Sequence, residues 1–373
     1  MITEKQISIL TIIMAILLIA AQCSSTPAPD NQTNYDHSQH DAQDENDHDE
    51  MGQAETELTP VELAEVELLN VVATTNIVGD IVNSVGGTHI NLTTLLPLGS
   101  DPHTYQPTPQ DVAAVAEADI VFINGLGLEE FLTDLIENAG GEAVVVDLSV
   151  GLPDLEEHDE HNEHEENGEA GEDHDDDMEE HGAHGETEGH DPHIWFNPIN
   201  VRAMVQQVEN SLAELDPQHQ TQYNANLENY ESELNILDQW IFNKINTLSA
   251  KRKNLVMDHN VLNHYANRYG LGQINSIIPS YSSNTSPSAQ ELAELQNQII
   301  EQKIRVIFVS ATANMTLAER LAEDTGIKLI PLYTGSLGEE GSGAETYLDY
   351  MRHNTQMIVN GLSGRSKSSD SAR

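Results

Sequence analysis

Three histidines outside the low-complexity stretches lie just after predicted strands, and two of them are beside turn residues. His103 lies in GSDPHTYQPTPQD, His193 in DPHIWFNP and His259 in VMDHNVLNHY. Neutral imidazole is a ligand that suits Zn²⁺. Each of these histidines, taken alone, is typical of a surface or capping residue. Together, two DPH triplets and a third histidine after a predicted strand indicate a metal site.

A further group of histidines lies between Asp154 and His193, in a stretch with eight of the chain's 17 histidines, 19 acidic residues and no Lys or Arg. Almost nothing in it can enter a hydrophobic core, so we expect a disordered acidic loop over 154–190. Clustered imidazoles and carboxylates favour metal handling over the alternative, a solvated loop with incidental histidines. We expect weak auxiliary metal binding at His158, His161, His164, His174, His181, His184 and His190.

The chain is strongly acidic, with 15 Lys and Arg against 63 Asp and Glu and a formal net charge of -48. No Lys or Arg occurs between Lys5 and Arg202. Nucleic acid and anionic membrane surfaces repel such a chain, so we exclude both as partners. The same charge attracts cations. Life in high salt is a second explanation for the low Lys content.

The amino terminus predicts export. Residues 7–21 form a nearly unbroken apolar run, shorter than the roughly 20 residues that span a bilayer, as in a secretory signal. Cys23, the only cysteine, follows directly and resembles the lipidated cysteine of a bacterial lipoprotein, although Gln22 stands where a small residue is usual. We expect a signal peptide over 1–22, lipid attachment at Cys23 and a disordered tether over 23–66. The protein would then be anchored at the cell surface or in the periplasm.

Short apolar strands alternate with amphipathic helices from residue 69 onward, which predicts an α/β fold of parallel sheets covered on both faces. The first set of strands is expected at 69–75, 89–97, 119–125 and 142–149, and the second at 254–260, 273–280, 305–313 and 327–333. The helices between them are expected at 77–86, 108–118, 128–141, 198–215, 261–270, 288–303, 315–326 and 344–362. We therefore predict two four-stranded lobes, over 67–217 and 251–364, and a disordered tail over 365–373.

One long helix is expected to join the lobes over 218–250. Its apolar residues recur every three or four positions from Tyr223 to Leu248. About 30 residues of helix span roughly 45 Å, enough to run along two small domains. A coiled coil is the alternative, but the stripe lacks the charge pairing that coiled coils use. The pattern favours a rigid spine with limited hinge motion.

The carboxyl ends of parallel strands form the edge at which α/β sheets bind ligands. His103 follows the second strand and His259 ends the first strand of the second lobe. The acidic loop leaves from the end of the fourth strand and returns to the fold at His193. We therefore expect the three histidines to meet around a metal ion in the cleft between the lobes.

Several segments together resemble zinc/manganese-binding solute-binding proteins of bacterial ABC transporters. They are GSDPHTYQPTPQD, NGLGLEEFL, DPHIWFNP, DHNVLNHYANRYGL, SPSAQEL and YTGSLGEEGSGAETYLDYMRHN, and the resemblance runs from residue 69 to 362. It implies two α/β lobes joined by a rigid helix, one divalent ion in the cleft, and delivery of that ion to a membrane permease. The family's metal histidines correspond to His103, His193 and His259. A His-rich acidic insertion before the second ligand is typical of zinc members.

Two departures from the family bear on the choice of metal. Gly335 stands in YTGSL where many relatives have an acidic ligand, and Ser310 stands where some manganese members have Glu. Mn²⁺ favours carboxylates, so their absence favours zinc, with water or a residue of the acidic loop as fourth ligand. Asp101, Asp258 and His264 are expected to support the site rather than to bind the ion. His264 stands where the family has Tyr, so a contribution from it stays open.

The leading prediction is a monomeric, extracytoplasmic zinc-binding protein of an ABC importer, with Zn²⁺ as its transported ligand and no catalytic residue. A manganese-binding member of the same family is one alternative. A metal-buffering, adhesin-like surface lipoprotein is another, in which the acidic loop is the active part. Three histidines and a water also suit a hydrolytic zinc enzyme with Asp258 or Asp101 as base, but no HExxH motif is present.

Overall fold

The structure is a computed structural model that describes residues 60–61, 68–153, 190–272 and 274–364. These residues belong to one compact unit, Thr56–Arg373. The expected signal peptide, Cys23, most of the tether, the loop 154–189 and the tail lie outside the described residues. Within the expected tether, the N–H of Val61 donates to the carbonyl of Leu215 at 3.0 Å. No described helix is both long and apolar enough to cross a bilayer.

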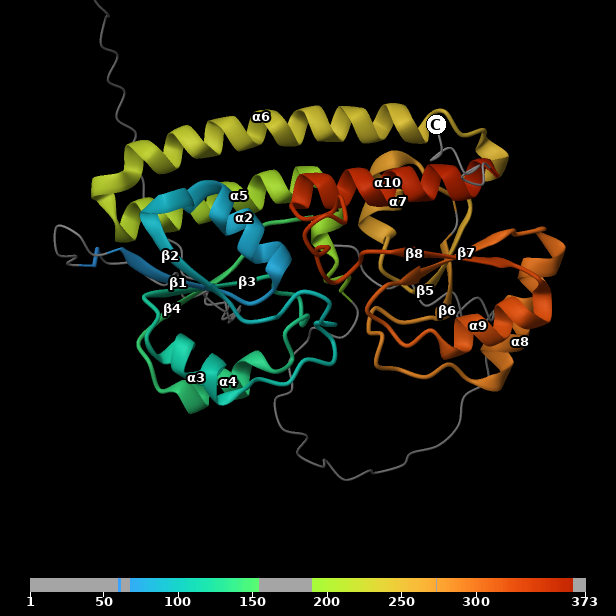
Figure 1. Cartoon of the computed structure of the whole chain (residues 1–373), viewed down its shortest axis with the longest axis horizontal. Helices are drawn as coiled ribbons and strands as arrows, with labels where there is room; N and C mark the ends of the chain where they lie inside the picture. Colours follow the sequence, from blue (N-terminus) through green and yellow to red (C-terminus); the bar gives the residue numbers. More distant parts are fainter. Residues whose placement is uncertain (1–59, 62–67, 154–189, 273, 365–373) are drawn as a thin grey trace, which may run out of the picture. The chain divides into compact units, whose positions relative to one another are not determined.

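The N-terminal lobe is built on the expected parallel sheet of four strands, and the structure shows that their order is β2-β1-β3-β4 (Figure 1). Its α3 helix begins as the sequence predicts, because the N–H of Thr108 donates to the carboxylate of Asp111 at 2.6 Å and closes a capping box. The elements of this lobe are β1 (Leu69–Ala73), α2 (Asn76–Gly86), β2 (Ile90–Thr94), α3 (Pro109–Ala116), β3 (Ile120–Ile123), α4 (Leu132–Ala139), β4 (Val144–Asp147) and α5 (Pro198–Leu215).

Successive residues of the central strands face two different cores. In β1, Val71 and Ala73 pack in a large core with α2 and α5, whereas Val72 packs in a smaller core with α3 and α4. In β3, Phe122 packs in the large core and Val121 in the smaller one. This alternation explains why apolar side chains occupy successive positions in Val71–Ala73 and Ile120–Ile123, since both faces of the sheet are covered.

The C-terminal lobe contains four parallel strands that are hydrogen bonded as two pairs, β5-β6 and β7-β8, with β5 beside β7. The sequence predicted one continuous sheet. Where the pairs meet, the N–H of Ser310 donates to the carboxylate of Asp258 at 3.0 Å, so a side chain bridges them. The elements are β5 (Leu255–His259), α7 (Asn263–Tyr269), β6 (Ile274–Ile278), α8 (Ala289–Glu301), β7 (Val306–Ser310), α9 (Thr316–Thr325), β8 (Lys328–Leu332) and α10 (Tyr347–Ser363).

The long helix α6 (Gln220–Ile245) lies within the range expected for it, between short 3-10 turns at Pro217–His219 and Ala250–Arg252. Its buried side chains recur every three or four residues from Tyr223 to Ile245. They pack on α2 and α5 of the N-terminal lobe and on α10 of the C-terminal lobe (Figure 1). The stripe therefore covers other helices of the same chain.

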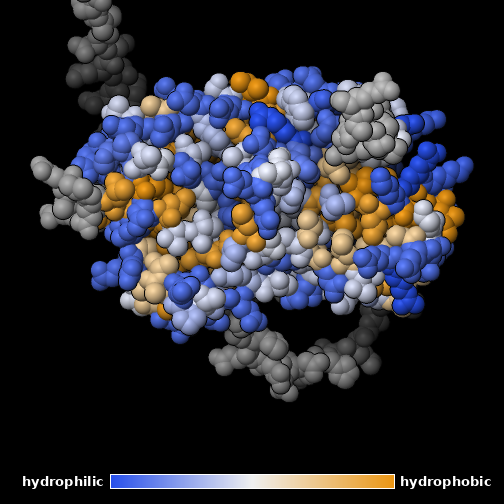
Figure 2. Space-filling view, viewed as in Figure 1, coloured by the Kyte–Doolittle hydropathy of each residue, from blue (hydrophilic) through white to orange (hydrophobic). Residues whose placement is uncertain are grey.

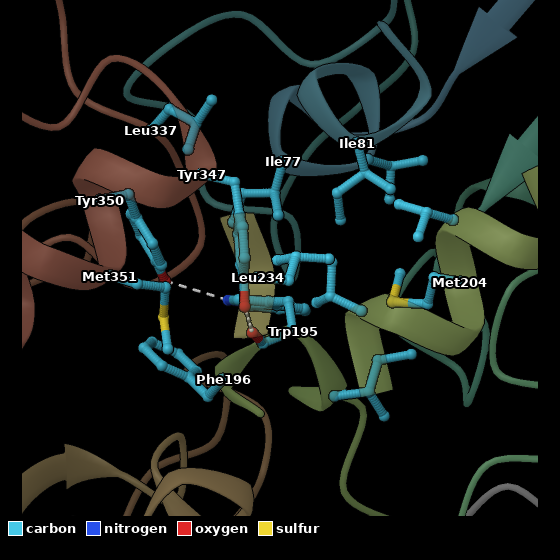
Figure 3. Close-up of a cluster of buried hydrophobic side chains, with 14 of the residues drawn as sticks. Ile77, Ile81, Trp195, Phe196, Met204, Leu234, Leu337, Tyr347, Tyr350 and Met351 are labelled. Atoms are coloured by element: carbon cyan, nitrogen blue, oxygen red, sulfur yellow. Dashed lines mark hydrogen bonds between the residues drawn. The ribbon is translucent and has the colours of Figure 1, made fainter. Parts of the chain in front are cut away.

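Both lobes share one hydrophobic core. Phe122 of β3 and Phe308 of β7 belong to it, together with side chains of α2, α5, α6 and α10. In this core, the indole N–H of Trp195 donates to the hydroxyl of Tyr350 at 3.0 Å, and the Tyr347 hydroxyl donates to the Trp195 carbonyl at 2.7 Å (Figure 3). The segment that follows His193 is thus hydrogen bonded to α10 through Trp195. The face shown in Figure 2 is largely hydrophilic with apolar patches between, since most apolar side chains are internal.

Candidate metal centre

The three predicted histidines come together. The Nε2 atoms of His103 and His193 lie 3.3 Å apart, and the ring of His259 lies 5.8 Å from His103 and 5.5 Å from His193 between centroids. A tetrahedral zinc ion with Zn–N bonds of about 2.0–2.1 Å would separate two ligand nitrogens by about 3.3 Å. In the described part of the chain, this is the only group of three His, Cys, Asp or Glu whose ligand atoms all lie within 4.8 Å of one another.

The two DPH triplets fold in the same way. The carboxylate of Asp101 accepts the N–H of His103 at 3.0 Å, and that of Asp191 accepts the N–H of His193 at 3.0 Å. Such a side-chain turn spans two residues, and the intervening proline restricts the backbone between them. The repeated triplet is therefore a local turn that brings a histidine from a loop into the group of three.

His193 is the most constrained of the three. Its Nδ1 lies 2.7 Å from the carboxylate of Asp191, and both side chains are buried. We assign the proton to Nδ1, which leaves the lone pair of Nε2 for a metal ion. A carboxylate on the far side of a metal-binding imidazole both orients the ring and raises its basicity.

His259 ends β5, at the carboxyl edge that the sequence predicted. Its Nδ1 lies 3.3 Å from the carboxylate of Asp258. That carboxylate also accepts the N–H and the hydroxyl of Ser310, at 3.0 and 3.1 Å. Ser310 thus holds the carboxylate of Asp258 next to His259.

Burial keeps His103 and His193 neutral. Burial, followed by the proximity of His193 and His259, lowers the pKa of His103 to about 3. Burial also brings the pKa of His193 well below its ordinary value. Both imidazoles are therefore unprotonated at neutral pH, which is the form that binds metal. Behind them, burial raises the pKa of Asp191 to about 6.

Asp101 and His264 contact the loops of the site but do not belong to the group of three clustered histidines. The carboxylate of Asp101 accepts the hydroxyl of Ser283 at 2.7 Å, which links the His103 loop to the C-terminal lobe. Both ring nitrogens of His264 contact protein groups: Nε2 lies 3.0 Å from the carbonyl oxygen of Asp191, and Nδ1 lies 3.4 Å from the side-chain amide of Asn200. The supporting role predicted for Asp101 and His264 agrees with these contacts.

Sequence reasoning missed two further positioning residues. The side-chain amide of Asn124, just after β3, donates to the carbonyl of Pro192 at 2.8 Å. Asn76 contacts the loop after β8 from the other lobe, donating to the Ser336 hydroxyl at 3.1 Å and accepting the N–H of Leu337 at 2.7 Å. Only the position of Asn124 at a strand's carboxyl end could have suggested its role, and nothing local distinguishes Asn76.

Gly335 lies directly against the loop that carries His103. A Cβ atom at this position would lie 2.6 Å from Cδ of Pro102 and 3.1 Å from Cγ. Any side chain at 335 therefore requires Pro102, the residue before His103, to move. The glycine therefore allows the two loops to approach and offers no side chain as a ligand.

Of the auxiliary histidines, only His190 belongs to the described residues. It is half-buried and precedes Asp191. His158, His161, His164, His174, His181 and His184 lie outside the described residues.

Comparison with known proteins identifies the family. The family model of the zinc-uptake complex component A, periplasmic (ZnuA), matches residues 71–361. The chain is 31% identical over 299 residues to the manganese-binding lipoprotein MntA of Halalkalibacterium halodurans, over 80% of this chain and 89% of MntA. It is 27% identical over 304 residues to the manganese ABC transporter substrate-binding lipoprotein PsaA of Streptococcus anginosus, over 79% of this chain and 89% of PsaA.

The chain also resembles a solved structure in its fold. The periplasmic zinc binding protein TroA from Treponema pallidum matches with a TM-score of 0.66 at 25% sequence identity, over 78% of this chain and 98% of TroA. The two-lobe α/β fold and the resemblance drawn from the sequence are confirmed. The proteins of this family bind a divalent metal as solute and are not enzymes. The chain belongs to the ZnuA family of metal-binding substrate-binding proteins of ABC transporters.

Proposed function

We propose that this protein is an extracytoplasmic, high-affinity zinc receptor that delivers Zn²⁺ to the permease of an ABC importer. The observation that carries the proposal is a group of three imidazoles, His103, His193 and His259, with no carboxylate ligand atom among them. Zn²⁺ is stable with three histidines and one further ligand in a tetrahedron, whereas Mn²⁺ favours carboxylate, carbonyl and water oxygens.

The neighbouring carboxylates support this ligand set because each already has partners. One oxygen of Asp101 binds the N–H of His103 and the other binds Ser283. One oxygen of Asp258 binds the N–H of Ser310 and the other its hydroxyl. Asp191 binds the ring of His193 from the side opposite the cleft nitrogen. We therefore propose water, or a residue of the acidic loop, as the fourth ligand.

The manganese alternative rests on relatives, since MntA and PsaA are both named for manganese. TroA, with a comparable share of the chain matched, is named for zinc. The names alone do not separate the two metals. The donor set of this chain favours zinc, and affinity for a divalent ion with imidazole ligands also rises from Mn²⁺ toward Zn²⁺ in the ordinary series.

Competition titrations with the purified full chain test the metal. We expect one tight Zn²⁺ per chain, and we expect Zn²⁺ to outcompete Mn²⁺ by several orders of magnitude. His193→Ala should abolish tight binding. His353→Gln is the matched control, because His353 packs on the ring of Tyr333 at 5.2 Å and is none of the three proposed ligands. Tight manganese binding by the wild type would establish the alternative.

The acidic loop is proposed as an auxiliary store that binds further zinc weakly through the seven histidines named above. Deleting residues 154–189 separates a transport receptor from a passive buffer. A receptor retains its single tight site and loses only the weak stoichiometry that the deleted histidines supply. A buffer or adhesin-like protein loses most of its binding.

We also propose export with residues 1–22 as signal peptide, lipid attachment at Cys23 and a tether over 23–66. The lobes are proposed to be 67–217 and 251–364, joined over 218–250, with hinge motion limited by the shared core. Cys23→Ser should release the protein from cell membranes into the soluble fraction without changing its zinc affinity. Retention of the variant on membranes would contradict lipid attachment.

A further inference from the structure

Two histidines outside the cleft lie in contact at the opposite edge of the first sheet. His89 ends the 3-10 turn Gly87–His89, directly before β2, and His219 ends the turn Pro217–His219, directly before α6 (Figure 1). His103 follows the carboxyl end of β2, so His89 lies at the other end of the same strand. We propose that His89 and His219 form a second, peripheral site for Zn²⁺, supported by Asp216.

The first observation is a carboxylate–imidazole pair like that of the cleft. The Nδ1 atom of His219 lies 2.6 Å from the carboxylate of Asp216. The corresponding distance from His193 to Asp191 is 2.7 Å. With the proton of His219 on Nδ1, its Nε2 lone pair is available to a metal ion, and the carboxylate fixes the ring and raises its basicity.

The second observation is an additional imidazole. The rings of His89 and His219 lie 4.6 Å apart between centroids with an angle of 36° between their planes. Within the described part of the chain, no hydrogen bond engages the ring of His89, although its carbonyl accepts the Tyr223 hydroxyl at 3.2 Å. Both rings are half-buried, which leaves them room to turn. A small rotation is required, because a shared zinc ion needs its two nitrogens about 3.3 Å apart.

The third observation is an excess of buried negative charge. Asp216 is only 2% exposed, and one of its oxygens has no hydrogen-bond partner among the described residues. The other oxygen accepts the hydroxyl of Tyr223 at 2.8 Å as well as the ring of His219. Its only ion-pair partner in the described residues is His219. A buried carboxylate that lacks full compensation favours a cation held by the adjacent imidazoles.

These contacts define the kind of site. His89, His219 and Asp216 do not form a group whose ligand atoms all lie within 4.8 Å, so the carboxylate acts through His219 rather than as a ligand. Two imidazoles and solvent oxygens then bind the ion, a set that suits zinc. With two protein ligands instead of three, this site binds Zn²⁺ more weakly than the cleft.

Zinc-dependent protection from diethyl pyrocarbonate, read residue by residue by peptide mass spectrometry, tests the proposal in the full chain. The reagent acylates a free imidazole nitrogen, and a bound ion blocks it. After one equivalent of Zn²⁺ has filled the cleft, further zinc should lower the reactivity of His89 and His219 together by about fivefold or more. His353 should not change.

Variants separate a metal site from two stacked imidazoles. His219→Gln should abolish the protection of His89, and Asp216→Asn should raise the zinc concentration needed for it by about tenfold. His353→Gln is the control and should leave it unchanged. Circular dichroism and tight binding of the first zinc ion report folding of each variant. Absence of protection at His89 in the wild type, or protection that persists in the folded His219→Gln chain, overturns the proposal and leaves the pair as a packing contact.

Discussion

The cleft triad (His103, His193, His259) and the peripheral pair (His89, His219) use the same local chemistry in different surroundings. In each, a carboxylate lies within 2.7 Å of the Nδ1 atom of one histidine. The triad gathers two imidazoles from loops of the N-terminal lobe and one from the end of β5 in the C-terminal lobe, whereas the pair gathers two from turns at one end of the N-terminal lobe. The number of imidazoles that converge therefore distinguishes the two sites.

Burial is the second difference. His193 and His259 are nearly inaccessible, and burial lowers the pKa of His103 and His193. Both rings of the peripheral pair remain half-buried. A buried neutral imidazole is available to a metal without first losing a proton, and the closed surroundings strengthen its attraction for the ion. We therefore expect the zinc affinity of each site to depend more on how many imidazoles the tertiary fold brings together and buries than on the carboxylate–imidazole pair that both sites share.

Removing a ligand of the triad should give the largest effect. His193→Ala leaves two imidazoles in the cleft and exposes the buried carboxylate of Asp191. We expect zinc affinity to fall by more than about a hundredfold, the upper range for loss of an outer partner of a ligand. His219→Ala should leave the tight site unchanged. Competition with a chromophoric zinc chelator measures both, and an equal loss in the two variants would contradict the assignment.

Removing a supporting carboxylate should give a smaller loss. Asp191→Asn keeps the hydrogen-bond turn to the N–H of His193 but removes the charge that holds its ring. We expect the affinity of the cleft for zinc to fall by about tenfold to a hundredfold. Asp216→Asn, which changes the corresponding residue of the peripheral pair, should not affect it. Unchanged affinity in Asp191→Asn would mean that the fold alone orients His193.

Substitution of Gly335 tests steric fit against ligand chemistry. A Cβ atom here would lie 2.6 Å from Pro102, so Gly335→Ala should disturb the His103 loop and weaken zinc binding by about tenfold. Gly335→Asp adds a carboxylate to the same disturbance. We expect it to bind Mn²⁺ more tightly than Gly335→Ala does, which narrows the preference for zinc. Isothermal titrations with both metals decide this, and wild-type zinc affinity in Gly335→Ala would remove the steric argument.

The smallest expected effect concerns pH. Three imidazoles with the ordinary pKa of about 6.5 would lose about a thousandfold in zinc affinity between pH 7.5 and 5.5 through proton competition. The lowered pKa values keep His103 and His193 neutral over this range, so neither contributes to that loss. The pKa of Asp191 is raised to about 6, so its carboxylate gains a proton as the pH falls. The protonated group supports the ring of His193 less well, and we expect the zinc affinity to fall moderately. Chelator competition at the two pH values measures the change, and a full thousandfold loss would contradict the neutral-histidine argument.

Much of the fold follows from local patterns that the sequence displays. Alternating apolar strands and amphipathic helices predicted every strand of both lobes, and the three-to-four spacing from Tyr223 predicted the buried stripe of α6. The DPH triplets likewise indicated a metal site, and each folds into a local turn beside its histidine. These features arise from backbone geometry and hydrogen bonds between near neighbours, so they are readable from spacing alone.

Other features depend on contacts between residues far apart in the chain. The division of the second sheet at Asp258 and Ser310 depends on how two strands meet, and the fit of Gly335 against Pro102 depends on two loops from different lobes. The meeting of His89 with His219 joins turns 130 residues apart. No local period encodes such contacts, because they follow from the packing of whole elements around a shared core. Residue types and spacing indicated which chemistry was available, and tertiary packing decided which side chains meet to perform it.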